Sequence, residues 1–231
     1  MKLSLKDITD DRRSGSSKII EKALNYLENL DRKSQIEAAK EIANAHPSMT
    51  GLANIMKLVE SYEIKEVRKI IEEMNENASK KLAEIVEGKS VVIISRSHIV
   101  ESGLHRARKV FILRSEPGGE GVDAYKFLKE KIEAELVCDA EMGYAVMKCN
   151  AVVCGADAIS KDGFVNKVGT LPLALTARHF NKPFYVVAPS YKAGRLRVVE
   201  PFEYVPADLA TLITESGITD WQKVHSLIGF L

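Results

Sequence analysis

The hydrophobic period of this chain changes near Gly88, and that change most constrains what the chain can fold into. Before it, apolar residues return every three or four positions, as on one face of an amphipathic helix. After it, short apolar runs alternate with helical patterns, which is typical of a parallel sheet covered by helices on both faces. We therefore expect an α/β protein with an N-terminal helical domain, residues 1–87, and a Rossmann-like domain, residues 88–231.

The individual elements follow from the same patterns. The first helix begins near Ser16, and Pro47 should introduce a bend before the third. The later predicted helices cover Ser34–Ala45, Ser48–Ser61 and Ile64–Val86. The predicted strands are Val91–Ile94, Val110–Leu113, Glu135–Val137, Ala151–Cys154 and Phe184–Ala188.

Ligands of such sheets bind outside the carboxyl ends of the strands. The loops that follow the predicted strands are therefore the candidate site. They span residues 95–98, 114–121, 138–144, 155–170 and 189–192.

The loop after Ala151–Cys154 contains the residues best suited to a phosphorylated ligand. Asp157 should project into the crevice, while Asn166 and Lys167 precede a helical pattern for which Thr170 is a good N-cap. Free amides at a helix start bind anions, and a lysine adds a mobile positive charge. The alternative is an ordinary turn, in which these side chains satisfy local backbone and solvent only.

Composition excludes some other functions. The net charge of +1 leaves no basic stripe for a run of nucleic-acid phosphates, so we expect no direct nucleic-acid binding. No segment approaches about 18 consecutive apolar residues, and the charged N-terminus lacks a signal core, so we expect no membrane association and a cytoplasmic location. The three cysteines have no metal-site spacing and are expected to be reduced thiols; we expect no metal and no cofactor.

Other loops carry weaker signals. The sequence GGEG at 118–121 lacks the spacing of a dinucleotide fingerprint. Asp139 and Glu141 could form a paired-carboxylate site, although two acids in one loop more often lie at a solvated helix start. His98 and His105 are seven positions apart on a predicted helix, too far for one metal without a third ligand, and are expected to be surface or packing residues.

The stretch GADAISKDGFVNKVGTLPLALTARHFNKPFYVVAPSYK, from Gly155 to Lys192, resembles the signature of proteins related to the alpha, beta and delta subunits of translation initiation factor 2B. SEPGGEG, CDAEMGY and HPSMTGLAN resemble further motifs of that family, so the similarity extends over most of the chain. The family includes isomerases of ribose 1,5-bisphosphate and methylthioribose 1-phosphate. The resemblance implies a helical domain followed by a Rossmann-like domain, and assembly into homo-oligomers through the C-terminal half.

The resemblance also implies functional residues. In the isomerases a cysteine of a T-H-C motif and the aspartate of GAD catalyse aldose–ketose interconversion, and an N-K pair and a later lysine bind phosphate and hydroxyls. The matching positions here are Asp157, Asn166, Lys167 and Lys192, but Ser97 stands in place of the cysteine.

Other positions near the implied site also differ from the isomerases. Arg96 stands in place of the T-H-C histidine, followed after Ser97 by His98. An N-terminal arginine-glycine phosphate motif is imperfect at Arg13, Gly15 and Ser16, and His46 stands where the isomerases tend to carry arginine.

Two functions from different classes fit these residues. One is a factor-2B-like subunit that binds a sugar phosphate or nucleoside monophosphate and acts by assembly, with itself or with a translation-factor partner. The other is a sugar-phosphate isomerase in which Cys138 or His98 replaces the missing thiol. A serine hydroxyl has a far higher pKa than a thiol and needs an activating base, so Ser97 favours the first. The apolar stretch 227–231 is a further reason to expect a dimer or larger assembly.

Overall fold

The computed structural model describes residues 3–11 and 15–227 of the chain. Its first part is helical, as the three- and four-residue period predicts, although the short helix before Ser16 was not expected. The helices are α1 (Leu5–Thr9), α2 (Ser16–Leu27), α3 (Arg32–Ala45), α4 (Thr50–Ser61) and α5 (Ile64–Val86). Helix α4 begins at Thr50 rather than at Ser48, and Pro47 lies in the turn before it.

The described residues also form a seven-stranded sheet in the order β10-β9-β7-β4-β1-β2-β3. All neighbours pair in parallel except β10 and β9, which form an antiparallel edge. The strands are β1 (Ser90–Ile93), β2 (Lys109–Leu113), β3 (Glu133–Val137), β4 (Ala151–Gly155), β7 (Phe184–Val187), β9 (Thr211–Thr214) and β10 (Gly217–Thr219). The α/β fold class is thus confirmed, and the chain order of the strands reverses between β1 and β4, the place where such sheets bind ligands.

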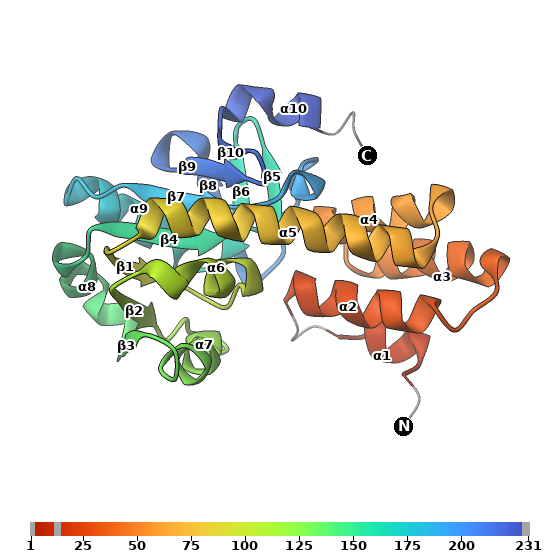
Figure 1. Cartoon of the computed structure of the whole chain (residues 1–231), viewed down its shortest axis with the longest axis horizontal. Coiled ribbons are helices and arrows are strands. Elements are labelled where there is room, and N and C mark those ends of the chain that lie inside the picture. Colours follow the sequence, from red (N-terminus) through yellow and green to blue (C-terminus); the bar gives the residue numbers. More distant parts are fainter. Residues whose placement is uncertain (1–2, 12–14, 228–231) are drawn as a thin grey trace.

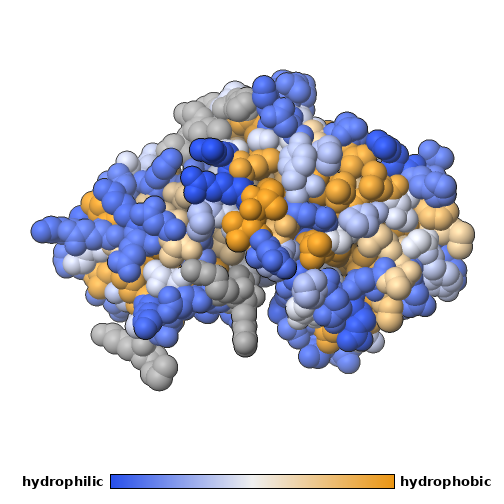
Figure 2. All heavy atoms as spheres, turned by 180° about the vertical axis from the view of Figure 1, so that it is seen from behind, coloured by the Kyte–Doolittle hydropathy of each residue, from blue (hydrophilic) through white to orange (hydrophobic). Residues whose placement is uncertain are grey.

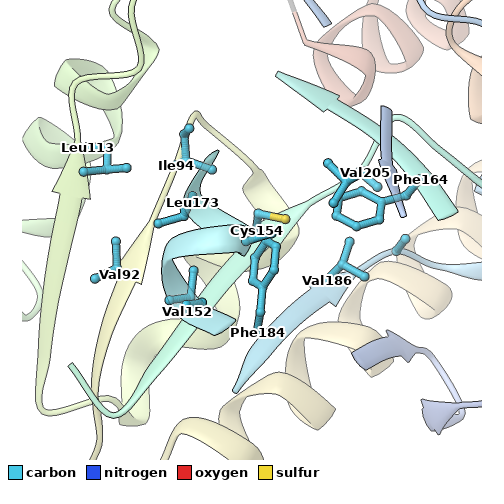
Figure 3. Close-up of a cluster of buried hydrophobic side chains, with 14 of the residues drawn as sticks. Val92, Ile94, Leu113, Val152, Cys154, Phe164, Leu173, Phe184, Val186 and Val205 are labelled. Atoms are coloured by element: carbon cyan, nitrogen blue, oxygen red, sulfur yellow. The ribbon is translucent and has the colours of Figure 1, made fainter. Parts of the chain in front are cut away.

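Helices cover both faces of this sheet because alternate strand residues point to opposite sides. Val92 and Val152 pack against α8 (Met142–Lys148) and α9 (Thr170–His179), in the cluster drawn in Figure 3. Their neighbours Val91 and Val153 pack on the other side, against α6 (His98–Gly103), α7 (Glu120–Leu128) and part of α5.

Helix α5 connects the helical layer to the sheet, and Figure 1 shows it running across both. Its first half contributes Val67 and Ile71 to the core of the helical layer. Its second half contributes Leu82 and Val86 to the core beneath the sheet. One straight element therefore belongs to two hydrophobic cores.

A second, three-stranded sheet was not expected from the sequence. Its order is β5-β6-β8, all antiparallel, with β5 (Ala158–Ser160), β6 (Gly163–Lys167) and β8 (Phe202–Pro206). Part of the predicted loop 155–170 is therefore a hairpin, and it receives a third strand from beyond the loop after β7. The last described helix is α10 (Val224–Leu227).

Candidate functional site

A cavity of about 760 Å³ lies at the carboxyl end of the sheet, between the loops after β1 and β4 and the helices α2 and α5. The predicted site residues in the described part of the chain all line it, although they come from segments far apart in the sequence. They are Gly15, Ser16, Ser97, His98, Asp157, Asn166, Lys167 and Lys192. Arg13 lies outside the described residues.

Asp157 lies two residues after the end of β4, at the point where the strand order reverses. Burial raises the pKa of its carboxyl, while the Lys192 charge and a hydrogen bond from the Ser16 hydroxyl act in the opposite direction. Burial lowers the pKa of Lys192, and Asp157 opposes that shift. Each group thus stabilises the charge of the other, and the pair can hold or release a proton inside the cavity.

Hydrogen bonds fix both the Lys192 side chain and the backbone on either side of it. Its Nζ donates to the Ala156 carbonyl at 2.6 Å, and only 3% of the residue is exposed. The buried Asn54 amide donates to the carbonyls of Tyr191 and Ala193, each at 2.8 Å, one on either side of the lysine. Asn54 is the last residue of the HPSMTGLAN motif. The motif was recognised in the sequence, but this role of Asn54 was not predicted from it.

Asn166 and Lys167 lie on strand β6 rather than in a loop. The Lys167 Nζ donates to Glu120 Oε1 at 2.8 Å and also to the Pro117 carbonyl. The other carboxylate oxygen of Glu120, Oε2, is buried and has no hydrogen-bond partner among the described residues. Sequence reasoning missed Glu120, although it lies in the SEPGGEG loop that was singled out.

The expected N-cap role of Thr170 is wrong. The N-cap of α9 is Gly169, whose φ of 98° lies in the left-handed region that favours glycine. The Thr170 hydroxyl instead donates to the Lys167 carbonyl at 2.6 Å and accepts from the Asn166 amide at 3.0 Å. The Leu171 amide in the first turn donates to Glu203 Oε1 at 2.8 Å. The start of α9 already holds a carboxylate of this protein.

Ser97 is the N-cap of α6, where its hydroxyl accepts from the Val100 amide at 3.4 Å. The Ser97 side chain packs against Gly155, at which a Cβ would stand 2.8 Å from the serine oxygen. Ser97, which the resemblance places at the cysteine position of the isomerases, therefore packs against the last residue of β4.

Arg96 and Glu101 form an ion pair on the same wall of the cavity, with 3.1 Å between Nε and Oε1. Burial raises the pKa of the Glu101 carboxyl, and Arg96 opposes the shift. Neither residue was predicted to pair.

His98 lines the cavity, but His105 does not share its helix, because α6 ends at Gly103. The prediction that the two histidines lie on one helix is therefore wrong. The His105 ring is hydrogen-bonded to the Ser102 carbonyl instead, through Nδ1 at 2.9 Å.

The remaining candidates lie elsewhere. Asp139 accepts from the amides of Ser115 and Glu116 at 2.9 and 2.8 Å, and Glu141 accepts from the Cys138 amide at 3.4 Å. These carboxylates accept backbone amides, and both residues lie in a one-turn 3-10 helix, Asp139–Glu141. Cys138 is exposed and is not among the residues that line the cavity. Within the described ranges no group of His, Cys, Asp and Glu side chains could hold a metal, and no helix is long and apolar enough to cross a membrane.

Comparison with known proteins gives matches over most of the chain. Residues 15–200 match the Initiation factor 2 subunit family. A "putative translation initiation factor eIF-2B subunit 2-like" protein of Pyrococcus horikoshii is 30% identical over 97% of this chain and 92% of its own length. Its namesake in Pyrococcus furiosus is 34% identical over 68% of this chain, which spans 63% of that protein. A methylthioribose-1-phosphate isomerase of Schizosaccharomyces pombe is 31% identical over 74% of this chain and 47% of its own length.

Solved structures give the same grouping. The crystal structure of a Pyrococcus horikoshii translation initiation factor eIF-2B matches with a TM-score of 0.82 and 27% identity, over 94% of this chain and 95% of the other. A tetrameric complex of eIF2B beta and delta subunits from C. thermophilum matches with a TM-score of 0.72, 18% identity, and coverage of 98% and 91%. At that identity the second match shows the fold alone.

Proposed function

Because the chain belongs to the Initiation factor 2 subunit family, we propose that it is a factor-2B-like subunit that binds a sugar phosphate or a nucleoside monophosphate and acts by regulatory assembly. The observation that carries this proposal is the convergence of the predicted ligand residues on one cavity. A cavity of about 760 Å³ is in the usual size range for sites of small molecules.

The cations of the cavity support a phosphorylated ligand. Lys167 and Lys192 are both almost fully buried, and each has a carboxylate nearby, Glu120 and Asp157 respectively. A lysine that donates to a protein oxygen can exchange that acceptor for a phosphate oxygen. Since Glu203 occupies the start of α9, the phosphate should be held by these lysines rather than by the helix amides.

The role of Ser97 supports binding over catalysis. Its hydroxyl accepts a backbone amide as a helix cap, and an aldose–ketose isomerase needs an acid and a base in reach of one carbon. Asp157 can supply one of these because its raised pKa suits proton exchange. The isomerase remains the second candidate, with His98 as the partner that lines the cavity; Cys138 does not line it.

Assembly is the second part of the proposal. Large hydrophobic side chains are exposed on α8 and α9, among them Tyr144, Met147 and Leu175. Apolar side chains are also visible among polar ones on the face shown in Figure 2. We propose that the C-terminal half forms a homo-oligomer, with a translation factor as a further possible partner, in the cytoplasm. The apolar stretch 227–231 lies almost wholly outside the described residues.

A ligand screen tests the binding function. Thermal shift against ribose phosphates, nucleoside monophosphates and methylthioribose 1-phosphate should give a dose-dependent rise in melting temperature for one class, because a ligand that binds only the folded state stabilises it. Turnover assays on each hit then separate the two candidates. A screen in which none of these compounds stabilises the protein would contradict both, and rapid isomerisation would promote the enzyme.

A further inference from the structure

Three neighbouring strands of the large sheet, β3, β2 and β1, are linked by hydrogen bonds just beyond their carboxyl ends. Asp139, Ser115 and Ser95 each lie two residues after the end of their strand. The Asp139 carboxylate accepts from the amides of Ser115 and Glu116, at 2.9 and 2.8 Å. The Ser115 hydroxyl accepts from the Ser95 amide at 2.7 Å. A chain of hydrogen bonds therefore runs from Asp139 through Ser115 to Ser95.

Two members of this chain have an unfavourable backbone conformation. The φ angles of Ser95 and Ser115 are 61° and 66°, in the left-handed region that residues other than glycine rarely adopt. Such a conformation persists only where its surroundings fix it, and it is found most often at functional sites. Ser115 is 1% exposed, and its hydroxyl also donates to the Leu113 carbonyl at 2.9 Å. The oxygen that holds Ser95 is therefore itself fixed.

The chain of hydrogen bonds ends at the wall of the cavity. Ser95 begins the segment 95–98, and all four of its residues line the cavity. The loop that contains Ser115 also supplies the two acceptors of Lys167 described above. Asp139 is not among the residues that line the cavity, so it can act on a ligand only through these segments.

The neighbouring acid, Glu141, shows what a purely local role looks like. Its carboxylate accepts from the Cys138 amide at 3.4 Å, three residues away along the chain. The two hydrogen bonds of Asp139 instead span 24 and 23 residues and join the ends of two strands. The same one-turn helix thus contains one acid that serves its own turn and one that connects to the cavity wall.

Resting on the proposed function, we propose that Asp139 is a positioning residue of the ligand site. It acts through Ser115 on the cavity wall 95–98, and through the same loop on the acceptors of Lys167. A carboxylate suits this role because it only accepts hydrogen bonds and can hold two amides at once. An asparagine in its place can hold one amide and presents a donor to the other.

Amide hydrogen exchange of the ligand-free protein, followed by NMR, tests the first step. In Asp139→Ala the Ser95 amide should exchange several-fold faster, although its acceptor is Ser115 and not Asp139, because Ser115 loses its anchor. Glu141→Ala is the matched control, and its Ser95 amide should exchange as in the unmodified protein. A Ser95 amide that is as protected in Asp139→Ala as in the control would overturn the proposal.

Titration calorimetry tests the effect on binding, with ribose 1-phosphate and adenosine monophosphate as probes of the two proposed ligand classes. Asp139→Ala should weaken binding about three- to ten-fold, which corresponds to the net contribution of one hydrogen bond. Asp139→Asn should recover part of that loss because it keeps one acceptor. Glu141→Ala should bind as tightly as the unmodified protein.

Two variants of Ser115 separate positioning from general stability. Ser115→Gly and Ser115→Ala both lose the hydroxyl that holds Ser95, but glycine adopts a φ of 66° without strain and alanine does not. The glycine variant should therefore have the higher melting temperature, while both variants lose affinity to the same extent. Affinity that instead follows the melting temperature would leave Asp139 and Ser115 with a structural role only and overturn the proposal.

The outcomes separate this inference from the function on which it rests. If the unmodified protein binds a probe and Asp139→Ala binds it equally well, the positioning role is overturned and the proposed function stands. If neither probe binds the unmodified protein, the proposed function is contradicted, and the role of Asp139 in a ligand site with it. Asp139→Asn and the two Ser115 variants decide the question if Asp139→Ala does not fold.

Discussion

Replacing Asn54 with alanine should destabilise the protein and weaken its ligand site together. Asn54 is 8% exposed, and its side-chain amide donates two hydrogen bonds of 2.8 Å, to the carbonyls of Tyr191 and Ala193. Leaving a buried acceptor unsatisfied costs about 1–3 kcal/mol, so losing both bonds should lower the free energy of unfolding by about 2–6 kcal/mol. For a chain of this length that corresponds to a melting temperature lower by roughly 4–24 °C.

The same change should act on the cavity because the two carbonyls flank Lys192. Without the amide, the loop that carries this lysine loses two hydrogen bonds to α4, and phosphate affinity should fall at least several-fold. Urea unfolding and ligand titration measure the two effects. Asn29→Ala is the control, since the Asn29 amide makes one exposed bond of 2.8 Å to the Asn25 carbonyl. If Asn54→Ala were no less stable than this control, the reasoning would be refuted.

Other outcomes follow from the same site. Lys167→Ala should weaken sugar-phosphate binding several-fold with an unchanged circular dichroism spectrum; equal affinity would place the phosphate elsewhere. Ser97→Cys should raise isomerase turnover, by up to the roughly 10²–10⁴ that a positioned acid or base contributes, and Asp157→Asn should abolish the gain; rapid turnover by the unmodified protein would contradict this. The pKa of Glu101 is raised above its usual 4.5, so the folded chain binds that proton more tightly than the unfolded chain. The unfolding free energy should therefore fall as pH rises from about 4.5 through the folded pKa, and urea titrations should show a smaller fall for Glu101→Gln. Light scattering should give a dimer or larger species; a monomer at micromolar concentration would contradict the proposed assembly.

The sequence predicted the parts of the fold that local periodicity encodes. The runs beginning at Val91 and Ala151 became β1 and β4, and the loop residues after them, Ser97 and Asp157, line one cavity. This worked because carboxyl ends of parallel strands meet at one edge of a sheet, whatever their separation along the chain. The domain boundary after residue 87 stays a prediction.

What the sequence did not predict depends on contacts between distant segments. Asn166 and Lys167 were assigned to a loop because their strand is completed by Phe202 and Glu203, more than thirty residues later. The same pairing brings Glu203 to the start of α9, so a remote carboxylate replaced the local cap expected at Thr170. The hydrophobic pattern of a short stretch of sequence cannot predict a partner that lies more than thirty residues away.

Helix α5 restricts how the cavity can admit a ligand. Its 23 residues form a rod of about 35 Å, and its opposite ends are embedded in two hydrophobic cores. A hinge between the helical layer and the sheet would have to pull one end of this rod out of its core. Entry should therefore depend on movement of the rim, where Val199 and Glu200 line the cavity in the connection before β8. A ligand of the proposed kind should then enter by the opening of this one loop, while the helical layer and the sheet keep their separation.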